Sequence, residues 1–204
     1  MIKSNKIYSV KEIFLTLQGE GYNTGTPAVF CRFSGCNLWN GIEKDRKKAV
    51  CSFCDTDFNG VNGINGGKYK LGDLVKIINS LWPKRKKNKF VVFTGGEPTL
   101  QLDSNLIKKI KSHGFKVAVE TNGTLPLPKE IDWVCVSPKI KSKLIVKKGD
   151  EIKVVFPQKS IVLSEYEKLN FQHFYIQPLE NKDVVLNTKK SIDYVLKNPK
   201  WKLS

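Results

Sequence analysis

Short apolar segments alternate along this chain with stretches of helical periodicity. Apolar side chains recur at helical spacing from Leu71 to Trp82 and from Leu106 to Ile110, and a last helix is expected at residues 190–197. Other segments, rich in Val, Ile and Phe, are continuously apolar, which is typical of strands buried on both faces of a parallel sheet. These six segments span residues 28–33, 90–93, 116–120, 133–136, 152–156 and 174–177. The alternation predicts an α/β fold of right-handed strand–helix–strand units.

Polar or glycine-rich residues follow most of the predicted strands. They are SGCN at 34–37, TGGEP at 94–98, TNG at 121–123, SPK at 137–139 and QP at 177–178. The periodicity does not separate an open doubly wound sheet from an incomplete barrel. In both arrangements, ligands gather at the carboxyl ends of the strands. The sequence therefore predicts one active site at this end of the sheet.

Size and charge limit the class of protein. The 204 residues suffice for one domain with a sizeable core, so a single domain over residues 1–204 is expected. The 35 basic and 19 acidic side chains give a net charge of +16, which would suit a polyanion. The excess is lysine, however, and arginine, which suits bidentate phosphate and base contacts, occurs only as Arg32, Arg46 and Arg85. We expect a solvated loop at the basic run 84–89 and no dedicated nucleic-acid binding.

The chain is expected to be cytoplasmic. Residues 1–6 carry charge without the apolar stretch of a signal peptide, and no apolar run approaches the roughly 18 residues of a membrane span. The five cysteines are an odd number with no regular disulfide spacing, which is typical of a reducing compartment. Clustered cysteines in such a compartment more often hold a metal or take part in chemistry.

Three of the cysteines form a cluster in the sequence. Fourteen residues separate Cys36 from Cys51, and two separate Cys51 from Cys54. A structural zinc needs four ligands, and the fourth would have to be Cys31, Asp55 or Asp57. The residues by themselves leave zinc and an iron–sulfur cluster about equally supported. Three thiolates with an open fourth position would favour catalysis over a purely structural site.

Several motifs together resemble a known family. They are LQGEG at 17–21, FCRFSGCNLW at 30–39, CDTDF at 54–58, GGEP at 95–98 and SPK at 137–139. Over residues 13 to about 180, the chain resembles the 7-carboxy-7-deazaguanine synthases of the radical S-adenosylmethionine superfamily. The resemblance implies an incomplete (β/α) barrel of about six parallel strands. The cysteine-bearing loop at 36–54 is longer than the superfamily's usual loop and matches the enlarged form of some synthases.

The resemblance also implies cofactors and the residues that hold them. Cys36, Cys51 and Cys54 would bind a 4Fe–4S cluster whose open iron takes S-adenosylmethionine. The implied contacts to S-adenosylmethionine are Phe53, Cys54, Asp55, Gly96, Ser137, Pro138, Lys139, Gln177, Pro178, Leu179 and Glu180. Without the resemblance, Gly95-Gly96 would be an ordinary turn and Lys139 a solvated surface lysine.

The implied reaction converts 6-carboxy-5,6,7,8-tetrahydropterin to 7-carboxy-7-deazaguanine with release of ammonia, a lyase step in queuosine biosynthesis. Thr56 would be a magnesium ligand, although by itself it would be a simple turn residue. The implied substrate contacts are Leu17, Gln18, Gly19, Glu20, Arg32 and Thr94. Arg32 suits a substrate carboxylate, and its alternative role is a buried ion pair. The resemblance further implies a homodimer and an electron donor such as flavodoxin.

Two other functions fit part of the pattern. One is a radical activase that places a radical on a glycyl-radical partner, and the other is a zinc-stabilised basic RNA-binding module. Cys31 and Cys135 lie in predicted strands, where they are expected to be buried as small apolar residues. The family usually continues past residues 201–204 and can reach its substrate with its last residue, so no site residue is assigned at Ser204.

Overall fold

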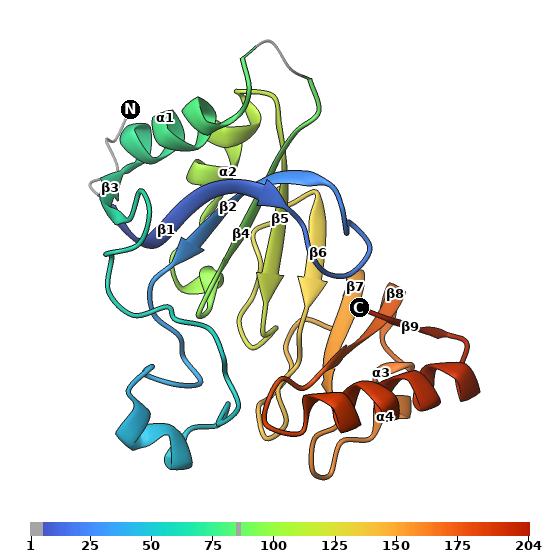
Figure 1. The fold of residues 1–204 in the computed structure, drawn as a ribbon. Helices are drawn as coiled ribbons and strands as arrows, with labels where there is room; N and C mark the ends of the chain where they lie inside the picture. Colours follow the sequence, from blue (N-terminus) through green and yellow to red (C-terminus); the bar gives the residue numbers. More distant parts are fainter. Residues whose placement is uncertain (1–5, 85–86) are drawn as a thin grey trace.

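The computed structural model describes residues 6–84 and 87–204. In this part of the chain, nine strands form one sheet in the order β3-β1-β2-β4-β5-β6-β7-β8-β9 (Figure 1). The strands are β1 (Ile7–Leu17), β2 (Pro27–Phe33), β3 (Gly67–Lys70), β4 (Lys89–Gly95), β5 (Phe115–Thr121), β6 (Trp133–Val136), β7 (Lys148–Phe156), β8 (Asn170–Pro178) and β9 (Trp201–Leu203).

Helices cover the outer face of this sheet. They are α1 (Leu71–Leu81), α2 (Ser104–Lys111), α3 (Leu163–Tyr166) and α4 (Val184–Lys197), with short 3-10 turns η1 (Glu43–Lys48) and η2 (Pro98–Leu100). Figure 1 shows α1 and α2 beside β1 to β5, and α3 and α4 beside β7 to β9. The loop that carries η1 projects on the side to which the carboxyl ends of β2, β4 and β5 point.

The predicted α/β architecture is confirmed, and each of the six predicted strands is present. They correspond to β2, β4, β5, β6, β7 and β8, and all of them run parallel. The sheet does not close, because β3 and β9 lie at its two ends. The connections from β5 to β6 and from β6 to β7 contain no helix. The fold is therefore an incomplete barrel.

Three strands were not predicted. β1 and β3 pair antiparallel, and buried and exposed side chains alternate along much of β1, so it lacks a continuous apolar run. β9 has only three residues, of which Trp201 is buried. The last helix was predicted to begin at residue 190, but it begins at Val184. The prediction missed its first turns because the side chains of Val185 and Leu186 face outward and give no amphipathic signal.

The core lies between the sheet and its helices. Leu74 and Ile78 of α1 and Leu106 and Ile110 of α2 are fully buried against the parallel strands. Burial of each such side chain contributes about 1.5–3 kcal/mol, which is what holds the helices in place. A second apolar cluster lies around Trp201 and links β7, β8, β9 and α4.

Local signals fix the ends of the shorter helix α2. The Asp103 carboxylate accepts a hydrogen bond from the backbone N–H of Leu106 at 3.0 Å, which caps the first turn. Gly114 follows the helix with φ of +83°, a left-handed conformation that favours glycine. The capping carboxylate and this glycine therefore set the two ends of α2.

Two sequence expectations fall partly outside the described residues. The basic run at 84–89 includes residues 85 and 86, and the charged start at 1–6 includes residues 1–5. Among the residues that are described, no helix combines the length and the apolar character needed to cross a membrane. Cys31 and Cys135 are buried in β2 and β6, as predicted.

Candidate active site

A cavity of about 660 Å³ opens at the carboxyl ends of the parallel strands, as the sequence predicted. This volume is in the usual range for a small-molecule site. Among its lining residues are the predicted Leu17, Gln18, Gly19, Glu20, Arg32, Cys51, Phe53, Cys54, Asp55, Thr56, Thr94, Gly96, Ser137, Lys139, Gln177, Pro178, Leu179 and Glu180. The fold thus brings distant motifs to one place. Two predicted residues, Cys36 and Pro138, are not part of this lining.

The three clustered cysteines lie in the loop that follows β2. The Sγ atom of Cys36 accepts a hydrogen bond from the backbone N–H of Leu38 at 3.4 Å. The Cys51 thiol donates a hydrogen bond to Cys54, which lowers the pKa of Cys54 to about 6, while this bond and burial raise the pKa of Cys51. The hydrogen bond from Cys51 thus favours the thiolate form of Cys54, which is the form that binds metals.

The loop around these thiols is fixed by Arg46. Its guanidinium donates to the backbone oxygens of Cys54 at 2.8 Å and Ser52 at 3.2 Å, and it packs 4.2 Å from the ring of Trp39. Within residues 6–84 and 87–204, no group of three or more His, Cys, Asp or Glu side chains is arranged as the ligands of a single metal ion.

The glycine-rich end of β4 brings the strand against the cysteine loop. A Cβ atom on Gly96 would lie 2.3 Å from the backbone oxygen of Gly35 and 2.7 Å from Cβ of Cys36. Only glycine permits this approach, because real Cβ contacts do not occur at such distances. The alternative role of Gly96, that of an ordinary turn residue, is therefore insufficient, because Gly96 sets the spacing between β4 and the cysteine loop.

Glu97 ties the ends of two strands together, a role that the sequence analysis missed. Its carboxylate is fully buried and accepts hydrogen bonds from Thr121 Oγ1 and from the backbone N–H of Asn122, both at 2.7 Å. It also accepts from the backbone N–H of Thr99 at 3.1 Å. These bonds hold the end of β4 beside the end of β5.

The residues present fit an iron–sulfur cluster and S-adenosylmethionine. Two of the three thiols of the loop, those of Cys51 and Cys54, line the cavity, and a backbone N–H points at Cys36 Sγ. The Oε1 atom of Gln177 is buried in the cavity wall without a hydrogen-bond partner among the described residues. A buried orphan acceptor needs a donor, and a bound ligand with amino or hydroxyl groups would supply one.

Lys139 was expected from composition to be an exposed surface lysine, and that alternative is wrong. Its side chain turns inward to the cavity, where Nζ donates to Ser137 Oγ at 2.6 Å. Burial lowers the pKa of Lys139, although the nearby Cys51 sulfur opposes this shift. A lysine amine therefore lies on the side of the cavity that carries the thiols.

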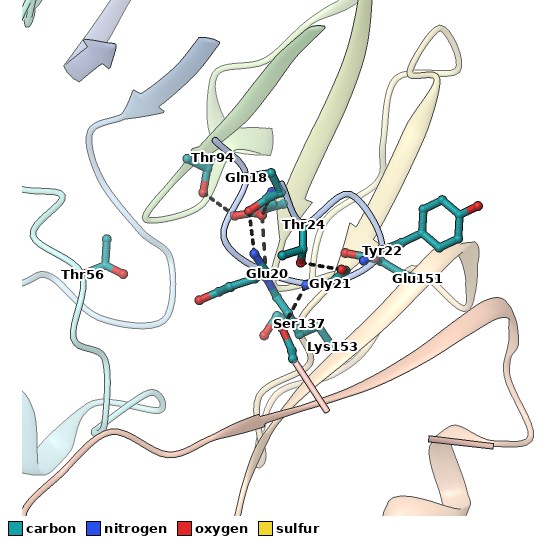
Figure 2. Close-up of polar contacts among 12 residues, drawn as sticks. Gln18, Glu20, Gly21, Tyr22, Thr24, Thr56, Thr94, Ser137, Glu151 and Lys153 are labelled. Atoms are coloured by element: carbon teal, nitrogen blue, oxygen red, sulfur yellow. Dashed lines mark hydrogen bonds and ion pairs between the residues drawn. The ribbon is translucent and has the colours of Figure 1, made fainter. Parts of the chain in front are cut away.

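A buried charged group lies on the opposite side of the cavity, and the sequence analysis missed two of its members. Glu120 accepts hydrogen bonds from Gln18 Nε2 at 3.0 Å and from Thr94 Oγ1 at 3.3 Å. Lys153 forms an ion pair with Glu20 (Figure 2). It forms a second ion pair, at 3.6 Å, with Glu120. A lysine inside the apolar run 152–156 was the available signal for this group.

Each charged residue in this group favours the charged form of its neighbour. Burial raises the pKa of Glu120, but the Lys153 ammonium and the hydrogen bonds from Gln18 and Thr94 lower it by more, so its net shift is downward. Burial lowers the pKa of Lys153, but its neighbours Glu120, Cys135 and Glu20 raise it well above its usual range. Both Glu120 and Lys153 are therefore charged at neutral pH.

Arg32 and Thr56 hold different positions around the cavity. Arg32 Nε donates to Glu12 Oε1 at 2.8 Å, so Arg32 forms the ion pair that was its alternative role. Arg32 also lines the cavity, as the substrate-contact role requires. Thr56 lies on the loop that follows Cys54, apart from Gln18 and Glu20 in Figure 2. Its Oγ1 donates a long hydrogen bond, of 3.3 Å, to Asp55, and its side chain also hydrogen-bonds Cys54.

Comparison with known proteins gives the class first. The family model of the Radical SAM superfamily matches residues 46–135, which include Cys51, Cys54 and Gly96. The open parallel sheet and the thiol loop beside a glycine-rich strand end agree with this match. The fold and the site therefore define a radical S-adenosylmethionine enzyme, a class that uses a 4Fe–4S cluster and S-adenosylmethionine.

Curated relatives then give the particular family. A 7-carboxy-7-deazaguanine synthase from Burkholderia multivorans is 56% identical over 198 residues, which is 97% of this chain and 94% of that protein. The synthase from Caulobacter vibrioides is 51% identical over the same shares. The crystal structure of QueE from Escherichia coli matches with a TM-score of 0.73 and 25% identity, over 98% of this chain and 94% of that one. The chain belongs to the 7-carboxy-7-deazaguanine synthase family.

Proposed function

We propose that this protein converts 6-carboxy-5,6,7,8-tetrahydropterin to 7-carboxy-7-deazaguanine with release of ammonia, as a lyase of queuosine biosynthesis. The observation that carries this proposal is the cavity itself, where the thiol loop faces the polar group around Gln18, Glu20 and Glu120. A zinc-stabilised RNA-binding module has no need of such a cavity. A glycyl-radical activase would need access for a protein loop rather than a site for a small ring system.

We assign Cys36, Cys51 and Cys54 as the thiolates that hold the cluster. When bound, the cluster and S-adenosylmethionine supply the one-electron chemistry that starts the rearrangement. The chain's part is to orient S-adenosylmethionine and to exclude water. We assign this part to Phe53, Cys54, Asp55, Gly96, Ser137, Pro138, Lys139, Gln177, Pro178, Leu179 and Glu180. The unpartnered Oε1 of Gln177 and the close approach of Gly96 to the cysteine loop support the assignment.

The substrate would bind on the far side of the cavity from the thiols. Gln18 and Glu20 offer an amide and a carboxylate, which suit the alternating donors and acceptors of a 2-amino-4-oxopyrimidine edge. Arg32 offers a guanidinium for the substrate carboxylate, in exchange for part of its contact with Glu12. Leu17, Gly19 and Thr94 complete the proposed substrate contacts.

Magnesium is proposed at Thr56. Mg²⁺ keeps several waters and binds through few protein ligands together with substrate oxygens. Thr56 lines the cavity, and its hydroxyl makes a long hydrogen bond to Asp55 that it would exchange for a bond to the metal. The ion would then hold the substrate's carboxylate and steer the rearrangement.

The wider setting is proposed from the family resemblance. We expect one catalytic domain over residues 1–204, a homodimer, a cytoplasmic location and a flavodoxin-like electron donor. The net charge of +16 supports an acidic protein donor, because opposite charges favour encounter. The scarcity of arginine supports the absence of dedicated nucleic-acid binding.

The proposed activity is tested with enzyme whose cluster has been reconstituted anaerobically. It is incubated with the carboxytetrahydropterin, S-adenosylmethionine, reductant and Mg²⁺, and the products are separated by chromatography. We expect 7-carboxy-7-deazaguanine. Formation of 5′-deoxyadenosine without any deazaguanine would leave the class intact and overturn the proposed substrate. About one zinc and no sulfide in the reconstituted protein would overturn the class as well.

A further inference from the structure

Strand β7 contacts the segment around Glu20 at two points. Glu151 and Lys153 are two residues apart on this strand, so both side chains point to the same face. Lys153 forms an ion pair with Glu20, and Glu151 Oε2 accepts a hydrogen bond from the backbone N–H of Tyr22 at 2.8 Å (Figure 2). Residues 20–22 are thus held against β7 by one contact on each side of Gly21.

Gly21 permits this close approach. Its φ is +69°, and a Cβ atom there would lie 2.6 Å from Oε1 and 2.8 Å from Oε2 of Glu151. The Glu151 carboxylate therefore packs directly against the backbone of the segment. Glu151 is only 3% exposed, so its hydrogen bond to Tyr22 is shielded from competing water.

The same segment is held by two further contacts. The Tyr22 ring stacks on the rings of His173 and Trp133, with centroid distances of 4.3 and 5.0 Å. The backbone N–H of Gly21 donates to Ser204 Oγ at 2.9 Å. Side chains of β6, β7 and β8 and the residue after β9 thus meet on a few residues that follow Glu20.

Glu151 differs from Lys153 in one respect. Lys153 and Glu20 line the cavity, whereas Glu151 does not. Glu151 therefore acts on a ligand in the cavity only indirectly, and its hydrogen bond to the backbone N–H of Tyr22 connects it to residues 20–22. Glu20 and Gln18 are coupled to this backbone, because Gln18 Oε1 accepts a hydrogen bond from the backbone N–H of Glu20 at 3.1 Å.

We propose that Glu151 is a positioning residue, which fixes the backbone of residues 20–22 so that Gln18 and Glu20 face the pterin ring. The inference rests on the proposed function, since that is where Gln18 and Glu20 are assigned to the substrate. Glu151 makes no contact with the substrate itself. Its carboxylate sets the position of the residues that do.

The first test replaces Glu151 and follows the substrate separately from the cofactors. Glu151→Ala should raise the KM for the pterin about tenfold, the effect of losing one hydrogen bond to a charged group. Glu151→Gln keeps an acceptor oxygen and should restore most of the affinity. Formation of 5′-deoxyadenosine without pterin should be equal in parent and variants, because Glu151 is not at the thiol side of the cavity. Glu165→Gln, an exposed carboxylate on α3, is the matched control.

A second readout needs no cluster. Hydrogen exchange of the Tyr22 amide should be slow in the parent and faster in Glu151→Ala, since the variant lacks the acceptor of this N–H. Tyr22→Ala, at a residue that is 53% exposed, tests the same segment even if Glu151→Ala does not fold. It should raise the KM for the pterin, and Tyr22→Phe, which keeps the stacked ring, should recover most of the loss.

The outcomes separate this inference from the proposed function. If the parent does not convert the pterin, the proposed function fails. If the parent converts it, and Glu151→Ala and Tyr22→Ala both keep the parent KM, only the positioning role is overturned. An equal loss of pterin turnover and of substrate-free 5′-deoxyadenosine formation in Glu151→Ala would also overturn it, because that result indicates a general structural defect.

Discussion

The Nζ atom of Lys153 lies 3.6 Å from Oε1 of Glu120, and both side chains line the same cavity. Only 7% of the Lys153 side chain is exposed, and its other carboxylate partner is Glu20. Removal of one member of a buried pair leaves the other as an uncompensated charge, which costs more than the pair contributes as a whole. This relationship links the stability of the protein to the arrangement of its proposed substrate site.

Replacement of Lys153 should therefore destabilise the protein. Lys153→Met keeps the length of the side chain and removes the ammonium, so that Glu120 and Glu20 lose the cation that they share. The free energy of unfolding should fall by about 3 kcal/mol in urea titrations. Lys168→Met, which breaks an exposed pair with Glu165 on the surface, should change it by less than about 1 kcal/mol. Equal effects of the two substitutions would contradict the buried pair.

The contribution of this pair to the free energy of unfolding should depend on pH. The pKa of Glu120 is lowered, so its contribution is present above the ordinary value of 4.5 and is lost as the pH falls through the lower folded-state pKa. The pKa of Lys153 is raised, so its contribution is present below 10.5 and is lost only at more alkaline pH. The stability difference between parent and Lys153→Met should thus be constant between these values and shrink in acid. A difference that grew in acid would reverse the assigned shifts.

Variants of the cysteines should fall into two groups by the iron and sulfide that they bind. Cys51→Ala should bind much less iron and sulfide after reconstitution and lose activity, because one cluster ligand is missing. Cys135→Ala should keep its iron and sulfide and lose mainly stability, since Cys135 is buried in strand β6 and is not part of the thiol loop. Turnover of the Cys51 variant at the parent rate would disprove the cluster assignment.

Gly96 should not tolerate a side chain. In Gly96→Ala the new Cβ would lie 2.3 Å from the Gly35 oxygen, so the end of β4 must move away from the cysteine loop. A displacement of this size should reduce 5′-deoxyadenosine formation by about 100-fold. Gly72→Ala is the matched control, because no atom lies within 4 Å of the added Cβ and α1 gains helix propensity. Parent-like cleavage in Gly96→Ala would refute the close approach.

Thr56 should affect the response to magnesium. Thr56→Ala should need about tenfold more Mg²⁺ for half-maximal turnover, because one oxygen ligand is lost. The measurement is a titration of chelated enzyme with Mg²⁺ at saturating substrate. Thr188→Ala on α4, whose hydroxyl donates to Val184 O within the helix, serves as the control. An unchanged Mg²⁺ requirement would remove Thr56 from the site.

The sequence pattern predicted the parallel strands in the core of the fold but not the strands at the edges of the sheet. Strands such as β4 are continuously apolar because both faces are buried, and that pattern is visible in one sequence. β1 is buried only in part and carries charged residues such as Lys11 and Glu12, while β9 is a three-residue edge strand. Their pairing depends on neighbours that are distant in the chain, so local periodicity could not predict it.

The site was predictable where its residues form compact motifs. The thiol loop and the glycine-rich strand end are continuous in sequence, and the cavity collects nearly all of their predicted residues. Glu120, Lys153 and Glu151 were missed because each stands alone in a strand, and its partner is more than a hundred residues away or on a neighbouring strand. Polar residues inside apolar strands were the signal, and only the topology shows what they contact.

The central claim is tested most directly by the stoichiometry of turnover. Reconstituted enzyme is given excess pterin, and the deazaguanine acid, ammonia, 5′-deoxyadenosine and remaining S-adenosylmethionine are quantified from the same samples. The account predicts equal amounts of the acid and of ammonia over many turnovers, with S-adenosylmethionine largely conserved. Consumption of S-adenosylmethionine to 5′-deoxyadenosine and methionine, without the acid or ammonia, would contradict it.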